Sequence, residues 1–153
     1  MSTFKTIARI VLCIALVSAI AGFYSVKRVI VDGISMEPSF HSGQTVFVWT
    51  SVPIASLKVG DVIVLHSADG NELIKRIVFI QSPQGNAQPP QVVWTPNGDK
   101  PFDELFYNYA SLDSIRPGED RRIWVMGDNY EHSEDSRDFG PIAPKQILGK
   151  VIK

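Results

Sequence analysis

A series of short runs of β-branched and aromatic residues limits the possible fold more than any other feature. Each run is bounded by glycine, proline or other turn residues, which is typical of strands rather than of long helices. Asp69-Gly70 separates two of the runs and is typical of a hairpin tip. The chain is therefore predicted to be mainly β, a β-barrel or β-sandwich with coiled connections. The runs lie at 27–31, 44–49, 61–66, 72–80, 91–95, 122–127 and 147–152.

The N-terminal part of the chain differs in composition from the rest. The run Ile10–Val26 contains no charged residue, and two basic residues follow it at once. A membrane-spanning helix needs about 17–25 predominantly apolar residues. We therefore expect one transmembrane anchor over residues 1–26 and a β-rich catalytic domain over 27–153. A cleavable signal peptide is the alternative, because residues 19–21, Ala-Ile-Ala, look like a processing site.

Composition and charge argue against several other classes of protein. The net charge of -1 gives no reason to expect a nucleic-acid partner. Cys13 is the one cysteine, so no intramolecular disulfide can form. The chain has no group of cysteines and histidines with metal-ligand spacing, so neither a metal nor another cofactor is expected.

The stretch GISMEPSF, residues 33–40, is the first candidate for chemistry. Its glycine, serine and proline suit an ordinary surface turn. That interpretation does not explain why the long apolar side chain of Met36 lies next to Ser35. A serine hydroxyl becomes a useful nucleophile only when a base removes its proton, so a base is sought elsewhere in the chain.

Lys75, within the run ELIKRIVFI, is the second candidate. In an extended strand its side chain shares a face with Leu73, Ile77 and Phe79, whereas Arg76 lies on the opposite face and can reach water. Burial disfavours an ammonium and lowers the pKa of a lysine. A neutral Lys75 amine could then act as a general base. The alternative is an edge-strand lysine that prevents aggregation.

The stretch 126–142, MGDNYEHSEDSRDFGPI, is the third candidate. A solvated loop would explain its charges and turn formers, but not the concentration of hydrogen-bonding side chains directly after an apolar run. Such side chains can build a scaffold around an Asp–Arg pair and hold a catalytic lysine in place. They are Asn129, Ser133, Asp135, Ser136 and Arg137.

Together these stretches resemble the bacterial type I signal peptidases, which are membrane-bound Ser/Lys proteases. The family's motifs occur here in the same order and with similar spacing, behind an apolar N-terminal run. The matching residues are Ser35-Met36-Glu37-Pro38, Gly60-Asp61-Val62-Ile63-Val64, Lys75-Arg76, Gly127-Asp128-Asn129, Ser133-Glu134-Asp135-Ser136-Arg137 and Gly140.

The resemblance implies a role for each candidate residue. Ser35 would be the nucleophile and Lys75 its general base, with Ser133 orienting the lysine amine. Asp135 and Arg137 would pair beneath the site. Some members of the family carry a serine two residues before the nucleophile, whose hydroxyl helps to bind the oxyanion. Here that position is Gly33, so the oxyanion would depend mainly on the Ser35 backbone N–H.

The resemblance also implies substrates and a location. Val31, Met36 and Ile74 would line small pockets that accept alanine at P1 and P3. The substrates would be signal peptides of exported preproteins, cleaved near the export translocase. The enzyme would be a single-pass protein of the plasma or inner membrane, in contact with the lipid bilayer, with its catalytic domain on the extracytoplasmic face.

Four alternatives remain open from the sequence. A self-cleaving repressor-type peptidase shares the Ser/Lys dyad, but it would carry a DNA-binding helical domain in place of the apolar run. A conjugation-type maturation peptidase would have a narrower substrate. An inactive membrane-anchored β-domain would only bind preproteins. A Ser-His-Asp hydrolase would use His41, His66 or His132, none of which lies in a recognisable motif.

Overall fold

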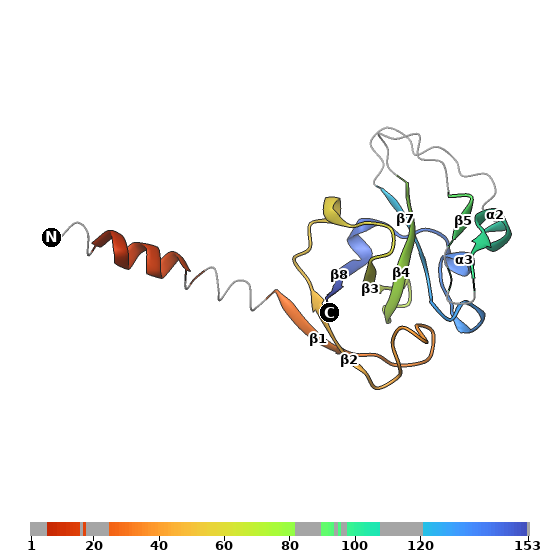
Figure 1. The fold of residues 1–153 in the computed structure, drawn as a ribbon, viewed down its shortest axis with the longest axis horizontal. Coiled ribbons are helices and arrows are strands. Elements are labelled where there is room, and N and C mark those ends of the chain that lie inside the picture. Colours follow the sequence, from red (N-terminus) through yellow and green to blue (C-terminus); the bar gives the residue numbers. More distant parts are fainter. Residues whose placement is uncertain are drawn as a thin grey trace.

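The protein is described here by a computed structural model that covers residues 6–15, 17, 25–81, 90–93, 95, 98–107 and 121–152. Residues 6–15 are helical and most of their side chains are exposed. Figure 1 shows this helix at the N-terminal end of the chain. Within the described residues, no helix has the length and apolar character needed to cross a membrane. The predicted anchor, residues 1–26, lies partly outside the described residues, and its division from 27–153 stays a prediction.

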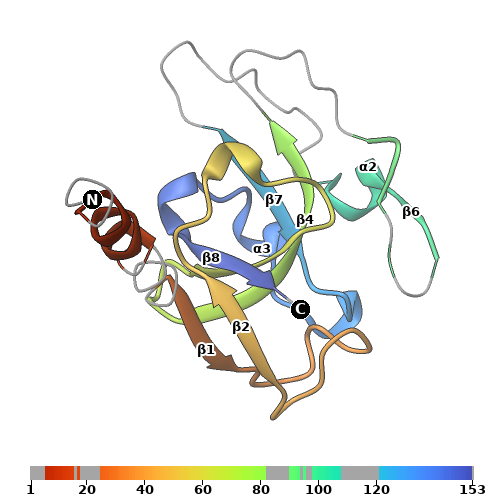
Figure 2. The same ribbon diagram turned by 60° about the vertical axis from the view of Figure 1, so that its left-hand side comes forward.

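The predicted mainly β fold is confirmed. Among the described residues, an antiparallel six-stranded sheet has the strand order β1-β2-β8-β3-β4-β7, and β5 and β6 form a separate pair. Figure 2 shows β1, β2 and β8 side by side, with β4 and β7 toward the other end of the sheet. The strands are β1 (Val26–Ile30), β2 (Thr45–Trp49), β3 (Val62–His66), β4 (Glu72–Gln81), β5 (Val92–Val93), β6 (Lys100–Pro101), β7 (Arg122–Met126) and β8 (Ile147–Ile152).

Short helices occupy the connections between strands. Among the described connections, two of them are single α-helical turns and three are 3₁₀ turns. Gly70, with φ of 82°, occupies the tip between β3 and β4, where the sequence predicts a hairpin. The helices are η1 (Ile54–Ser56), α2 (Phe102–Leu105), η3 (Tyr130–His132), α3 (Ser136–Phe139) and η4 (Pro144–Gln146).

The sheet does not close into a barrel. β1 and β7 are its two ends, and the described strands contain no pairing between them. β8, the last strand in the sequence, lies between β2 and β3 and joins the two halves of the sheet. The β1–β2 hairpin and the β3–β4 hairpin, which carry the first and second candidate stretches, therefore belong to one continuous sheet.

Three groups of buried apolar residues form the core of the described part. One lies under β1, β2 and β8 and includes Met36, the second lies around Ile63 and Ile77, and the third gathers aromatic rings around Trp124. In the third group Phe102 and Phe106 contact Trp124 edge-on. This aromatic group covers the end of the sheet where β4 pairs with β7.

A break in the register of β4 changes one expectation. The pairing of β4 with β7 shifts between Ile77 and Phe79, as at a β-bulge. Leu73 and Ile77 pack in the second core group, but Phe79 packs in the aromatic third group together with Val78. Strict alternation along β4 therefore ends after Ile77, and Phe79 does not belong with the apolar residues on the Lys75 side.

Candidate active site

Ser35 lies in the turn-rich connection between β1 and β2. Gly33 has a φ of 86°, which is in the left-handed region where glycine carries no steric cost. The turn is closed by a hydrogen bond of 3.1 Å from the Glu37 N–H to the Ile34 carbonyl. Met36 is fully buried in the first core group, so the residue after the serine fixes this connection to the core.

Lys75 reaches this serine from the middle of β4. Its Nζ lies 3.0 Å from Ser35 Oγ and donates to it. Lys75 pairs with Ile63 of β3, and its whole residue is only 3% exposed. A strand in the middle of a sheet thus brings the buried amine to a hydroxyl held on a separate connection.

Burial lowers the pKa of Lys75 below its ordinary value. The nearby carboxylates of Asp135 and Glu134 oppose this shift, because they favour the charged ammonium, but they do not overcome it. The amine is therefore easier to deprotonate than an exposed lysine. A neutral amine next to a hydroxyl can accept its proton, which reverses the direction of the hydrogen bond described above.

Asp135 is the centre of the hydrogen-bonded turn that follows β7. Its carboxylate is completely buried and forms an ion pair with Arg137, whose Nε lies 2.8 Å from Asp135 Oδ1. It also accepts from the Ser133 hydroxyl at 2.9 Å and from the Gly127 N–H at 3.0 Å. At the start of α3 it caps the helix through the Arg137 N–H. One carboxylate therefore organises the whole turn between β7 and α3.

Ser133 is placed next to the site, with a different partner from the expected one. Its hydroxyl donates to Asp135, and among the described residues it makes no hydrogen bond with the Lys75 amine. Gly127 has no room for a side chain: a Cβ there would collide with the Ser133 side chain and would lie 2.5 Å from the Ser35 carbonyl oxygen. Ser35, Gly127 and Ser133 are therefore in close contact.

Arg76, next to Lys75, is held by the first residues after β7. Its guanidinium makes two hydrogen bonds with Asp128, at 2.7 and 2.6 Å, and a third with the Gly60 carbonyl at 2.8 Å. A two-point contact of this kind fixes both direction and distance. The pair joins β4 to the Gly127-Asp128-Asn129 segment, so Arg76 does not simply extend into water.

The residues expected to bind substrate belong to the core. Val31, Met36 and Ile74 are all buried and pack in the first group, with exposures of 3%, 0% and 9%. All three belong to the same group of core residues, although Ile74 comes from a different hairpin. Any substrate side chain that meets them can therefore contact only a small part of each.

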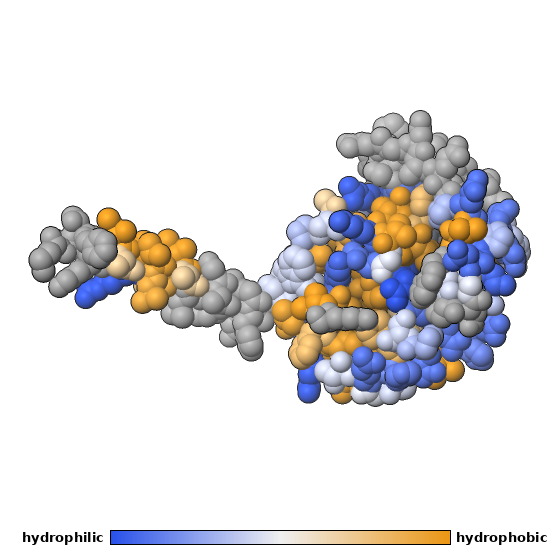
Figure 3. Space-filling view, in the orientation of Figure 1, coloured by the Kyte–Doolittle hydropathy of each residue, from blue (hydrophilic) through white to orange (hydrophobic). Residues whose placement is uncertain are grey.

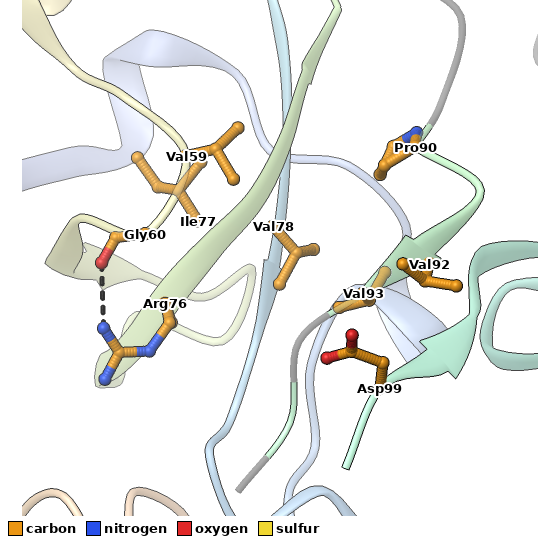
Figure 4. Close-up of a pocket in the computed structure, with 9 residues that line it drawn as sticks. All are labelled: Val59, Gly60, Arg76, Ile77, Val78, Pro90, Val92, Val93 and Asp99. Atoms are coloured by element: carbon orange, nitrogen blue, oxygen red, sulfur yellow. Dashed lines mark hydrogen bonds between the residues drawn. The ribbon is translucent and has the colours of Figure 1, made fainter.

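A separate cavity of about 430 Å³ opens beside β4, and Figure 4 shows its lining. Arg76 and Gly60 contribute its polar edge, where Arg76 donates to the Gly60 carbonyl. Neither Ser35 nor Lys75 lines it. The remaining walls are mainly apolar and come from β4, from β5 and from residues before β3, β5 and β6: Val59, Ile77, Val78, Pro90, Val92, Val93 and Asp99.

The three histidines are exposed. His41 lies 3.6 Å from the Glu37 carboxylate, and His132 Nδ1 lies 3.3 Å from Asn129 Oδ1. None of them hydrogen-bonds the Ser35 hydroxyl in the described part of the chain. The basic group next to this hydroxyl is the Lys75 amine, which is the arrangement that a serine/lysine hydrolase needs.

The mainly β fold and the buried lysine–serine contact define a class of protein, the hydrolases that pair a serine with a lysine. Comparison with known proteins gives the family. A family model described as "Signal peptidase, peptidase S26" matches residues 3–81 and 87–153. The chain therefore belongs to the signal peptidase family, peptidase S26, and the resemblance drawn from the sequence is confirmed.

Curated relatives carry names that agree with this family. Signal peptidase IB of Staphylococcus aureus (strain COL) is 29% identical over 153 residues, which covers 86% of this chain and 78% of the relative. Mitochondrial inner membrane protease subunit 2 of Schizosaccharomyces pombe is 27% identical over 128 residues, which covers 80% of this chain and 60% of the relative. The chain is thus a serine endopeptidase of the signal peptidase I type, from a family that removes signal peptides.

Two residues of the site had no individual role in the sequence analysis, where Asn129 was only one of several scaffold side chains and Asp128 only part of a motif. Asp128 holds Arg76, and Asn129 contacts the Ser35 connection through both its backbone and its side chain. In the sequence, only a dense polar turn after an apolar run pointed to them. Their partners are distant in the chain, so local patterns could not identify them.

Proposed function

We propose that the chain is a membrane-anchored endopeptidase that cleaves signal peptides from exported preproteins, with Ser35 as nucleophile and Lys75 as general base. The observation that supports this most directly is the 3.0 Å contact between Lys75 Nζ and Ser35 Oγ in a buried environment. The family assignment supports the reaction class, and this contact supports the choice of Ser35 and Lys75 as the reacting groups.

In the first half of the proposed reaction, Ser35 Oγ attacks the scissile carbonyl carbon. Lys75 Nζ accepts the hydroxyl proton, and the carbonyl π electrons move to the oxygen, which the Ser35 N–H stabilises. The C–N bond then breaks, and Lys75 returns a proton to the leaving amine. The products of this half are the mature protein and an acyl-enzyme on Ser35.

In the second half, a water molecule attacks the acyl-enzyme. The Lys75 amine takes one proton from the water and delivers it to Ser35 Oγ as the ester bond breaks. The turn around Asp135 would keep the lysine and the serine in position through both halves. Ser133, which is hydrogen-bonded to Asp135, would limit the movement of the Lys75 side chain by packing near it.

We further propose that the enzyme selects small residues at P1 and P3. Val31, Met36 and Ile74 are already packed in the core, so a large side chain would have to displace them. Overpacking of this kind typically costs about 1–3 kcal/mol. A preprotein with P1 Ala→Phe is therefore expected to be cut about 5- to 160-fold more slowly, and an equal rate would contradict this part of the proposal.

Membrane anchoring is part of the same proposal. The run Ile10–Val26 is uncharged, and Figure 3 shows apolar surface on the N-terminal helix and in patches on the β domain. Exposed apolar residues also lie on the edge hairpin, where Ile30, Phe47 and Trp49 are 59%, 51% and 37% exposed. We propose a single span in the plasma or inner membrane, with the catalytic domain on the extracytoplasmic face near the export translocase.

The test is cleavage of a labelled preprotein in detergent by the full chain. Wild type should cut, whereas Ser35→Ala and Lys75→Met should lose about 10³-fold or more in kcat/KM. Ser51→Ala and Lys58→Met change the same residue types at exposed positions and should leave cleavage unchanged. Full activity of Ser35→Ala would overturn the proposal.

A panel of unrelated preproteins separates the proposal from the narrow-substrate alternative. A general signal peptidase should cut most preproteins that carry small residues at P1 and P3. Cleavage of one preprotein alone would favour the maturation-type peptidase.

A further inference from the structure

The peptide bond between Ile34 and Ser35 carries the donor on which the proposed oxyanion site depends. Within the described residues, the Ser35 N–H donates to no acceptor, and Ser35 is half-buried. Gly33 offers no side-chain hydroxyl, and its own N–H donates to Ser42 Oγ at 3.3 Å. The Ser35 N–H is thus available to a substrate, and its direction decides whether it can meet the oxyanion.

The direction of this N–H is set by the carbonyl at the other end of the same peptide. In a planar trans peptide, the C=O of one residue and the N–H of the next point in opposite directions. A group that holds the Ile34 carbonyl in place therefore also aims the Ser35 N–H. The Glu37 N–H holds this carbonyl from within the turn, at 3.1 Å.

Asn129, from the segment after β7, holds the same carbonyl from outside the turn. Its Nδ2 donates to the Ile34 oxygen at 3.2 Å, and its backbone N–H donates to the Ser35 oxygen at 2.9 Å. These two hydrogen bonds grip the carbonyls on both sides of the Ser35 Cα. One bond therefore holds the peptide that carries the Ser35 N–H, and the other holds the next peptide, on the far side of the Ser35 Cα.

The Asn129 side chain is itself restrained. Because its Nδ2 faces a carbonyl oxygen, its Oδ1 must face the other way, and there it lies 3.3 Å from His132 Nδ1. An amide oxygen can only accept, so the His132 ring carries a proton on Nδ1 when this bond is made. Asn129 is therefore held between an exposed histidine and the nucleophile connection.

We propose that Asn129 is a positioning residue that aims the Ser35 N–H at the oxyanion by holding the Ile34–Ser35 peptide plane. The donor to the Ile34 carbonyl also polarises this peptide, which strengthens the N–H at its other end. This inference rests on the proposed function, since it assumes that Ser35 is the nucleophile. Gly33 has no side chain that could help to bind the oxyanion, so on this inference the segment after β7 supports the oxyanion site instead.

The central variant is Asn129→Asp, which keeps the shape and the backbone N–H but cannot donate from its side chain to the Ile34 oxygen. Asn129→Ala removes the side chain without adding charge and serves if the aspartate variant does not fold. Asn71→Asp is the matched control, because Asn71 is exposed at the β3–β4 tip. All chains are full length in detergent, and rates are compared at alkaline pH, where Lys75 is neutral in each.

Two measurements separate oxyanion positioning from general damage. The first is kcat and KM for a preprotein, together with peptide affinity in the Ser35→Ala background. The second is the inhibition constant of a substrate-like peptide trifluoromethyl ketone. With this probe the Ser35 Oγ–carbon bond forms, the carbonyl π pair moves to the ketone oxygen, and the hydroxyl proton passes to Lys75. The adduct therefore places an oxyanion where the Ser35 N–H would bind it.

The expected result is a kcat about 10–100-fold lower in both Asn129 variants, with KM and peptide affinity within about 2-fold of wild type. Ketone affinity should fall by a factor similar to that of kcat. Asn71→Asp should match wild type throughout. Unchanged kcat and ketone affinity in the Asn129 variants would overturn the inference, and so would an equal loss of peptide and ketone affinity. The proposed function would still stand in either case, provided that wild type is active and Ser35→Ala is inactive. Wild-type activity that survives Ser35→Ala would overturn both.

Discussion

At the level of single residues, the fold disfavours the charged form of Lys75. Lys75 is buried in the middle of a sheet, and burial lowers its pKa. Its neighbours Asp135 and Glu134 pull in the opposite direction. The protonation state of this amine is thus set by a balance between desolvation, which lowers its pKa with a smaller effect from Arg137, and the nearby carboxylates, which raise it. Each side of this balance can be changed by mutation.

Replacing Lys75 tests the need for a neutral amine. Lys75→Arg should be inactive although charge and length are roughly kept, because a guanidinium does not lose its proton in proteins. Wild-type activity should rise with pH through the lowered lysine pKa and fall at acid pH, as measured by kcat/KM against pH. Substantial cleavage by Lys75→Arg would show that Lys75 is not the base. Loss of cleavage in a single His→Gln variant would instead favour a Ser-His mechanism over the Ser35–Lys75 dyad.

Lys75→Met is the folding control for this experiment. The folded state lowers the pKa of Lys75, so between the folded and the unfolded pKa the unfolded chain binds more protons, and stability rises with pH in that window. Lys75 therefore lowers the stability of the folded state most at pH values below its folded pKa. Lys75→Met should be at least as stable as wild type, with an advantage that shrinks as pH rises toward the ordinary lysine value.

Glu134→Gln tests the other side of the balance. Glu134 is exposed and raises the pKa of Lys75 by its charge. Removing that charge should lower the pKa further and move the acid limb of the rate profile to lower pH, with little change in the plateau. Glu104→Gln, an exposed change distant in sequence, is the control and should leave the limb in place. A shift to higher pH would contradict the electrostatic argument.

Gly127→Ala tests the close packing of the site. An alanine Cβ would meet the Ser133 side chain and the Ser35 carbonyl, and backbone can yield only by moving the nucleophile. We expect a stability loss of about 1–3 kcal/mol and a cleavage rate lower by about 10-fold or more. Gly70→Ala, at a hairpin tip with open space and a φ of 82°, should lose stability but keep its rate. Equal rates in both variants would show that the contact is unimportant.

At the level of elements, the turn between β7 and α3 behaves as one unit. Asp135 connects the Gly127 N–H, the Ser133 hydroxyl and Arg137, and it caps α3. Ser136 continues this network, because its hydroxyl accepts from the Val125 N–H of β7 at 2.9 Å. α3 contacts β7. A helix of four residues has little stability of its own, so these side-chain bonds keep it in place.

Asp135→Ala should therefore harm stability as well as turnover. It would leave the Arg137 guanidinium without its buried partner, and the loss of one member of a buried pair costs about 3–5 kcal/mol. Because the Arg137 side chain is 19% exposed, we expect a loss at the lower end, about 3 kcal/mol. Urea unfolding of Asp135→Ala against an exposed Asp69→Ala control measures this. Identical midpoints would show that the pair is not structural.

At the level of the whole molecule, one open sheet brings two hairpins and a distant turn to a single point. β8 joins the halves, and the contacts Arg76–Asp128 and Asn129–Ile34 connect segments that are distant in the sequence. The membrane arrangement is the remaining question at this scale, since signal peptides emerge on the outer side of the membrane.

A reporter fused to the C-terminus tests the proposed topology. If residues 1–26 form one span with the N-terminus inside, a C-terminal reporter enzyme that works only in the exterior compartment should be active. A reporter active only in the cytoplasm should be silent, and this fusion is the control. The reverse pattern would place the catalytic domain on the wrong face for this function.

The strands and the candidate dyad were accessible to sequence analysis for local reasons. β-branched runs between turn residues predict strands wherever they pack, and Ser35-Met36-Glu37-Pro38 and Lys75-Arg76 are short motifs. The position of Phe79 was not accessible, because the bulge in β4 arises from pairing with β7. The partner of the Ser133 hydroxyl was not accessible either: Lys75 was the expected partner, but the hydroxyl donates to Asp135, and only positions in space distinguish the two.

The sequence alone was enough for the mainly β class, the family and the choice of Ser35 and Lys75 as the candidate reacting groups, because these depend on residue types at short spacing. The tertiary structure was needed for the open edge of the sheet, the burial of Lys75, the Arg76–Asp128 pair and the grip of Asn129 on the Ile34 carbonyl. Each of these depends on strands paired across long stretches of chain. A local pattern records which groups a chain carries, whereas desolvation and hydrogen-bond direction arise only when distant segments meet.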